Sequence, residues 1–303
     1  MKLVHTAAIA ALLIAHAHAA TLCGGHGTRD TMLVSTAWLM QHLHDSNLVV
    51  LSIGDKGEYD AGHIPGALYL DYMATHSMHS PAGLSLELLP APDLARVFEK
   101  LGVSNNSRIV LCWTRNQYSP TTRVFWTMDA MGLAPQTSIL DGGYPAWKGE
   151  GRPVSTETRP VTPGKLAPCA QDDVLVDAAY VRANLNHPTV RTVDARDPEY
   201  FTGAKAGSGK RPGHIPGAIN ITFSTLLDDT GKFRTPDDLA AMFRSAGVRS
   251  GDRVVSYCHI GQQATVVYFV ARLLGYDARL YDGSWEDWSA HAEHEVETSS
   301  PKK

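Results

Sequence analysis

The sequence predicts an α/β protein made of two tandem domains, each with a mainly parallel sheet flanked by helices. The chain has 303 residues, a length that suggests about two domains. The segment GHIPGA occurs twice, at 62–67 and 213–218, which indicates an internal repeat. In both halves short apolar runs alternate with helical patterns, as in parallel sheets covered by helices.

Composition and charge are those of an ordinary soluble globular protein. Hydrophobic residues make up 44% of the chain and charged residues 19%, and the formal net charge is −4. This balance gives no reason to expect nucleic acid or an anionic membrane as a partner. The four cysteines show neither a disulfide framework nor paired metal-ligand spacing, so no metal site is predicted, and the pairing of Cys23, Cys112 and Cys169 stays open.

Residues 1–20 have the pattern of a signal peptide. Lys2 gives a positive start, residues 7–15 form an apolar run too short to span a bilayer, and small residues at 17–20 suit cleavage. We therefore expect an exported, periplasmic protein that has no membrane partner once this segment is removed.

Each half predicts the same succession of elements. The first half has apolar strands at 48–53 and 108–113 and helices at 92–101 and 121–131, which end before Gly102 and Gly132. The second half has strands at 189–194 and 253–258 and helices at 236–246 and 265–274, which end before Gly247 and Gly275. The proline-rich stretch 151–172 has linker composition, so the predicted domains cover 32–150 and 173–291.

Cys258 is the strongest candidate for chemistry. It ends a predicted strand, and a short loop with Gly261 leads at once into a helix. Ligands in parallel sheets bind beyond the carboxyl ends of the strands. Backbone N–H groups of the loop and of the helix start would face the sulfur, lower its pKa and stabilise an anion on it.

These features together resemble the rhodanese family of sulfurtransferases in its tandem-domain form. The resemblance is carried by the two GHIPGA segments, Asp194-x-Arg196 at a strand end, the Cys258-x-x-Gly261 loop, and the Asp-Gly-Gly and Asp-Gly-Ser segments at 141–143 and 282–284, each followed by tryptophan. It implies an enzyme that takes a sulfane sulfur onto Cys258 as a persulfide. The sulfur then passes to a thiophilic acceptor such as cyanide or a thiol, without metal or organic cofactor.

The resemblance also suggests roles for neighbouring residues. The loop residues are expected to bind substrate: His259, Ile260, Gly261, Gln262 and Gln263. Arg196 is expected to bind an anionic donor through its planar guanidinium, the alternative being a structural ion pair. Asp194 and Asp282 are expected to support the site structurally. The loop lacks the basic pair typical of thiosulfate-directed members. Because His259 can carry charge and Arg196 remains, we expect thiosulfate as donor, with 3-mercaptopyruvate as the alternative.

The first half lacks the nucleophile. Aligning Arg108 with Arg253 puts Trp113 opposite Cys258 and leaves Cys112 one residue early, on the other face of its strand. We expect Cys112 to pack in the sheet and this half to shape one wall of the cleft. His63 and His214 occur in both repeats and are expected to be structural.

Two other functions share parts of this pattern. A cysteine phosphatase would need an arginine at the end of the loop, where Ala264 stands instead. A non-enzymatic sulfur-carrier or redox binding module would leave Cys258 without a catalytic role.

Overall fold

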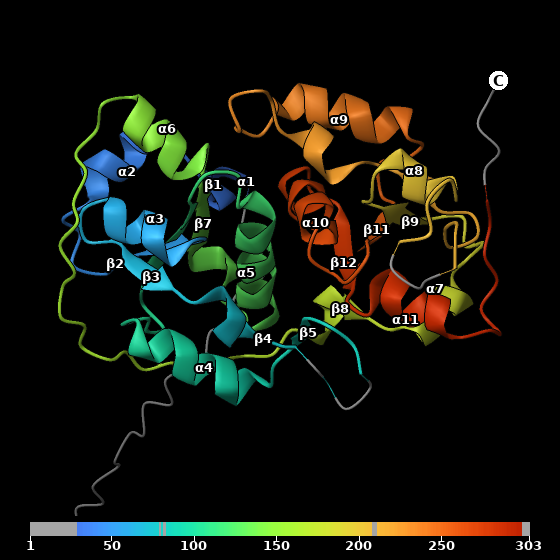
Figure 1. Cartoon of the computed structure of the whole chain (residues 1–303), viewed down its shortest axis with the longest axis horizontal. Helices are drawn as coiled ribbons and strands as arrows, with labels where there is room; N and C mark the ends of the chain where they lie inside the picture. The colour runs from blue at the N-terminus through green and yellow to red at the C-terminus, as the bar shows by residue number, and fades with distance from the viewer. Residues whose placement is uncertain (1–28, 79, 81–82, 208–210, 299–303) are drawn as a thin grey trace, which may run out of the picture.

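The computed structural model describes residues 29–78, 80, 83–207 and 211–298. The predicted signal peptide lies outside these ranges, as does Cys23. Within them, no helix combines the length and apolar character needed to cross a bilayer. Figure 1 shows the two halves of the chain side by side, each with its own sheet and its own covering helices.

The N-terminal half forms a five-stranded parallel sheet. Its order is β1 (Leu33–Val34), β7 (Thr137–Leu140), β6 (Arg108–Trp113), β2 (Leu48–Ile53) and β3 (Leu68–Leu70). The apolar runs predicted as strands at 48–53 and 108–113 are confirmed at both ends. Both are buried over most of their length, as expected for strands covered on two faces.

The C-terminal half repeats this sheet in the same order. Its strands are β8 (Leu175–Val176), β12 (Asp277–Tyr281), β11 (Arg253–Tyr257), β9 (Val190–Asp194) and β10 (Ile219–Asn220). Arg108 pairs with Leu48 in one sheet, and Arg253 pairs with Val190 in the other. The predicted alignment of the two repeats is therefore reproduced in strand register. The strand predicted at 253–258 ends one residue earlier, so Cys258 is the first residue beyond β11.

Helices cover both sheets. The first half contains α1 (Arg29–Met32), α2 (Thr36–His42), α3 (Lys56–Ala61), α4 (Ala91–Lys100), α5 (Tyr118–Ala130) and α6 (Gly143–Gly149). The second contains α7 (Ala178–Ala183), α8 (Pro198–Phe201), α9 (Pro236–Ser245), α10 (Ala264–Leu273) and α11 (Ser284–Ala290). Short 3₁₀ turns are η1 (Tyr72–Thr75), η2 (Ala134–Gln136), η3 (Asp172–Val174) and η4 (Phe223–Leu226), and β4 (His76–Ser77) pairs antiparallel with β5 (Glu87–Leu88).

Helix α5 begins three residues before the predicted start at Thr121, and it includes Pro120. The prediction placed the start after the proline. However, the N–H groups of a first helical turn have no partner inside the helix, so proline is tolerated there.

One hydrophobic core runs through both halves. Helices α5 and α10 lie against each other between the two sheets (Figure 1). The core cluster contains Phe125 and Met128 from α5 and Val266 and Phe269 from α10. The rings of Phe125 and Phe269 meet edge to face with centroids 4.9 Å apart. Nearly every residue of both helices is buried, because each helix packs against its own sheet on one side and the other half on the opposite side.

The stretch predicted as a linker runs extended along the N-terminal half. Ser155 exchanges two backbone hydrogen bonds of 2.9 Å with His63, and Gly164 donates its N–H to the carbonyl of Glu99 at 2.8 Å. Farther on, the N–H of Gln171 donates to Ala130 at 2.9 Å. The chain therefore reaches the second half while hydrogen-bonded to the first.

Candidate active site

Cys258 lies where strand β11 ends and the loop toward helix α10 begins. Three backbone N–H groups point at its sulfur, those of Ile260, Gly261 and Ala264. Gly261 has φ +81°, a left-handed conformation that lets the loop curl around the sulfur and that costs glycine little. The arrangement is the ring of amide donors expected from the sequence, at the carboxyl edge of the sheet.

The environment of the sulfur is nonetheless closed. The Cys258 side chain is 0% exposed, and burial raises the pKa of its thiol above the usual value. The N–H groups of Ala264, Ile260 and Gly261 lower that pKa in turn, but they do not outweigh burial. The expectation of a lowered thiol pKa is therefore wrong for this closed state, although the donors that would stabilise an anionic sulfur are in place.

A second turn, between β12 and α11, fixes the backbone around Cys258. The N–H of Cys258 donates to Ser284 Oγ at 3.2 Å, and that hydroxyl donates to the carbonyl of Tyr281 at 2.9 Å. The N–H groups of Trp285 and Glu286 donate to the carbonyls of Cys258 and His259 at 3.0 and 2.9 Å. The first turn of α11 thus satisfies backbone groups of the cysteine loop.

In the N-terminal half, Trp113 occupies the position equivalent to Cys258. Its indole packs edge to face against Phe233, with centroids 6.4 Å apart, so it contributes to the contact between the halves. Cys112 is a free, buried thiol on the opposite face, among Val34, Leu39 and Trp147. Burial raises the pKa of Cys112 far above its usual value. The prediction that Cys112 packs in the sheet is confirmed.

Arg196 is bound inside the protein. Its side chain is 1% exposed, and its Nε and Nη2 donate to Asp194 at 2.9 and 2.6 Å. Nη2 also donates to the carbonyl of Gly213 at 2.8 Å, and the guanidinium lies 4.6 Å from the ring centroid of Trp285. The planar donor fork is directed at Asp194, and the binding of an anionic donor by Arg196 stays a prediction. The ion pair is the alternative that the sequence left open.

The loop side chains differ in their surroundings. His259 packs edge to face on Tyr200, with centroids 4.6 Å apart. Burial, and then the positive charge of Arg196, lower the pKa of His259 below its usual value. The imidazole is therefore neutral near pH 7, which removes one of the two positive charges on which the expectation of thiosulfate relied, the other being that of Arg196. Ile260 contributes its N–H to the sulfur, and Gln263 keeps a buried Oε1 without a hydrogen-bond partner.

Gln262 was expected to bind substrate, but its amide contacts the N-terminal half. Its Oε1 accepts from Tyr72 Oη at 3.0 Å, and its Nε2 donates to Ser119 Oγ at 3.1 Å. Thr122 and Thr265 share a hydrogen bond of 2.8 Å between the two halves. The loop is therefore held by hydrogen bonds from the other half of the chain, and a cleft with this half as one wall stays a prediction.

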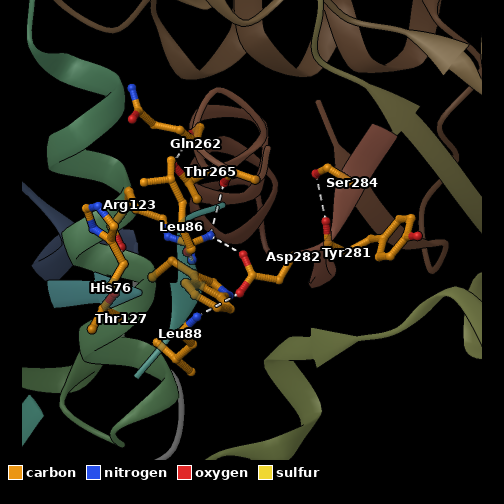
Figure 2. Close-up of polar contacts among 12 residues, drawn as sticks. His76, Leu86, Leu88, Arg123, Thr127, Gln262, Thr265, Tyr281, Asp282 and Ser284 are labelled. Atoms are coloured by element: carbon orange, nitrogen blue, oxygen red, sulfur yellow. Dashed lines mark hydrogen bonds and ion pairs between the residues drawn. The ribbon is translucent and has the colours of Figure 1, made fainter. Parts of the chain in front are cut away.

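Sequence reasoning missed Arg123 on α5, which makes several polar contacts with the second half. Figure 2 shows its guanidinium directed at the carboxylate of Asp282, with which it forms a buried ion pair. It also donates to the carbonyls of Gly261, at 3.2 Å, and Leu86. The other oxygen of Asp282 accepts from the N–H of Leu88 at 3.1 Å. Ser119, Thr122 and Arg123 share the three- and four-residue spacing of one helix face, but sequence alone does not reveal what that face meets.

The remaining predicted polar residues are bound elsewhere. His63 and His214 are buried, with Nδ1 at 2.8 and 2.6 Å from backbone carbonyls, in line with structural roles. Two basic side chains of the second half are also paired within the protein: Lys205 pairs with Glu199 at 2.6 Å, and Arg211 donates to backbone carbonyls near the end of α11. Cys169 is disulfide-bonded.

A cavity of about 540 Å³ lies beside the Asp282 turn. Leu88, Tyr180, Arg279 and Tyr281 line it, and Cys258 does not. Within the part of the chain that the structure describes, no cluster of three His, Cys, Asp or Glu side chains is placed to hold a metal ion.

Comparisons with known proteins agree with this architecture. The rhodanese-like domain model matches residues 35–150 and 177–291. The sulfur carrier protein TtuD of Thermus thermophilus is 30% identical over 85% of this chain and 93% of its own length. A thiosulfate sulfurtransferase of Azotobacter vinelandii is 28% identical over 88% and 97%.

A solved structure adds the same fold at full length. This is the crystal structure of SseA from Escherichia coli, described as a rhodanese fold of 3-mercaptopyruvate sulfotransferases. It superposes on this chain with a TM-score of 0.74 at 27% identity, and the match covers 84% of this chain and 99% of that one. With both of its halves matched, this chain belongs to the rhodanese-like family as a tandem of two such domains, and it is a sulfurtransferase.

Proposed function

We propose that the protein moves a sulfane sulfur from thiosulfate to a thiophilic acceptor, cyanide or a thiol, through a persulfide on Cys258. The observation that carries the proposal is the ring of N–H groups from Ile260, Gly261 and Ala264 around the Cys258 sulfur. Amide donors fixed before the reaction stabilise negative charge without reorganising, so they suit an anionic sulfur at either stage of the cycle.

The two steps balance without a cofactor. The Cys258 thiolate attacks the outer sulfur of thiosulfate, a new S–S bond forms, and the old S–S bond breaks as sulfite leaves with its electron pair. Cyanide or a thiolate then attacks the outer sulfur of the persulfide, and the Cys258 thiolate leaves. Because burial raises the pKa of the thiol, the first step should speed up as pH rises and the thiolate fraction grows.

A second donor, 3-mercaptopyruvate, carries one negative charge where thiosulfate carries two, so the loss of a positive charge at His259 through its lowered pKa disfavours this donor less. Two of the relatives differ in the same way: one is a thiosulfate sulfurtransferase, and the other is described as a 3-mercaptopyruvate sulfotransferase. Parallel measurements of kcat/KM with the two donors decide between them.

The central test is the mass of the protein after incubation with thiosulfate. We expect wild type to gain one sulfur atom on the peptide that contains Cys258 and to lose it when cyanide is added. Cys258→Ser should gain none, while Cys112→Ser should behave as wild type because Cys112 lies on the other face of the sheet. Sulfur transfer that survives in Cys258→Ser would overturn the mechanism.

We also propose that the chain is exported to the periplasm. The pattern of residues 1–20 supports this, and the disulfide at Cys169 fits an oxidising compartment. Fractionation of the source cells, with the mature N-terminus determined by mass spectrometry, tests it. A cytoplasmic protein that keeps residues 1–20 would contradict it.

A further inference from the structure

The N-terminal half reaches the cysteine loop through one buried arginine. Arg123 lies on α5, 1% exposed, and it is 138 residues away in sequence from Gly261, whose carbonyl it binds. Its two terminal nitrogens contact three separate segments: the loop at Gly261, the turn at Asp282, and Leu86, the residue just before strand β5. A single planar guanidinium therefore sets the relative positions of three chain segments.

Both routes from Arg123 end at Cys258. In the first, Arg123 holds the carbonyl of Gly261, whose own N–H points at the sulfur. In the second, Arg123 holds Asp282, and the turn that Asp282 begins presents Ser284 Oγ to the N–H of Cys258. The N–H groups around the sulfur and the backbone of Cys258 are thus held in place by the N-terminal domain, which itself has no nucleophile.

We propose that Arg123 is a positioning residue for the reaction. From the N-terminal domain, it orients the backbone N–H groups that surround the Cys258 sulfur. The inference rests on the proposed persulfide chemistry at Cys258. It assigns to the first domain a part in setting the geometry of the site, beyond forming one wall.

Electrostatics supports the same assignment. Burial lowers the pKa of Arg123, but the charges of Asp282 and Cys258 outweigh it and leave the pKa raised. The guanidinium is therefore positive and close enough to interact with an anionic sulfur. Its removal should disfavour the thiolate as well as loosen the loop.

The chain offers a matched control in a second buried contact between the same helices. Arg272 on α10 lies 3.4 Å from Asp129 on α5, and both are largely buried. This contact also joins the two halves, but the Arg272 guanidinium contacts Asp129 and the ring of Tyr268 rather than the Cys258 loop. Arg272→Met therefore measures the effect of losing an arginine between the domains without loosening the loop.

The test compares Arg123→Met, the double variant Arg123→Met/Asp282→Asn, and Arg272→Met. The double variant removes the unpaired buried carboxylate that would destabilise the single variant, and it keeps an acceptor for the N–H of Leu88. Thermal unfolding reports folding. Single-turnover persulfide formation with thiosulfate reports the reaction, and alkylation of Cys258 by iodoacetamide across pH, located by peptide mass, reports the thiol.

We expect the double variant to remain folded and to form the persulfide on the order of a hundredfold more slowly. Its Cys258 should be alkylated only at higher pH than in wild type, because the loop N–H groups that lower the thiol pKa are no longer held in place. Arg272→Met should match wild type in both readouts. An alkylation profile and a rate in the double variant equal to those of Arg272→Met would overturn the proposal. If wild type gains no sulfur, the proposed function fails, but the alkylation profiles still decide whether Arg123 positions the thiol.

Discussion

At the scale of single residues, the most constrained backbone near the sulfur is that of Ser284. It has φ +51°, in the left-handed region that non-glycine residues rarely adopt. The equivalent residue of the first repeat is Gly143, with φ +58°, so the turn itself requires this conformation. The serine hydroxyl joins the N–H of Cys258 to the carbonyl of Tyr281. A strained residue at this position is explained by the hydrogen bond that it provides to the nucleophile.

Two substitutions at Ser284 separate strain from hydrogen bonding. Ser284→Ala keeps the strained backbone and loses the hydroxyl, whereas Ser284→Gly loses both. We expect Ser284→Gly to be more stable than Ser284→Ala by about 1 kcal/mol in urea unfolding. Both should slow sulfur transfer by a similar factor, about tenfold. If Ser284→Gly retained full activity, the hydroxyl would have no role in the site.

At the scale of elements, the loop between β11 and α10 fits its surroundings only if residue 261 has no side chain. A Cβ on Gly261 would lie 2.7 Å from both the carbonyl and the Oδ1 of Asp282 and 3.0 Å from Nη1 of Arg123. At the other end of the same helix, Gly275 has a similar φ of +85°, but a Cβ there would have no heavy atom within 4 Å. Both glycines need a positive φ, but only Gly261 has neighbouring atoms too close for a side chain.

Alanine at these two positions isolates the packing requirement. Both variants place a non-glycine residue at positive φ, a cost of about 1–2 kcal/mol each. Gly261→Ala must in addition displace Asp282 and Arg123, so we expect a larger loss of stability and sulfur transfer slowed on the order of a hundredfold. Gly275→Ala should keep wild-type kcat/KM. Equal activities in the two variants would show that the loop does not need the close approach.

The same elements show how far the sequence could be read. Strands, helix ends and the place of Cys258 depend on local patterns, and the prediction located them to within a few residues. The contacts of Arg123, Tyr72 and Ser119 were missed because they join residues 138, 190 and 143 positions apart. They depend on how α5 and α10 pack. The ion pair of Arg196 with Asp194 and the lowered pKa of His259 could not be read from the sequence, because both follow from burial, which is a property of the folded chain.

At the scale of the whole molecule, the repeat explains the interface between the halves. Thr122 and Thr265, each ten residues before the glycine that follows its helix, meet across it. Asp129 and Arg272, each three residues before that glycine, form an ion pair. Equivalent positions of two related helices therefore face each other, as in a twofold symmetric dimer. The shared core follows from this packing, so we treat unfolding of both halves as a single transition.

The pH dependence of that transition should depend on His76, which lies 4% exposed in β4 beside this interface. Burial and then Arg123 lower its pKa from 6.5 to about 4, against the opposing charges of Asp282 and Asp71, and its Nε2 has no hydrogen-bond partner. Between about pH 6.5 and 4, His76 is therefore protonated in the unfolded chain but neutral in the folded protein.

Stability associated with His76 should therefore be complete above about pH 6.5 and be lost progressively as pH falls to about 4. We expect wild type to lose on the order of 2 kcal/mol more than His76→Gln between pH 7 and pH 4.5, because glutamine cannot take up the proton. Urea unfolding of both proteins at several pH values measures this difference. If the unfolding free energies of the two proteins changed with pH in the same way, the pKa of His76 would be the same in the folded and unfolded states, which would contradict the prediction.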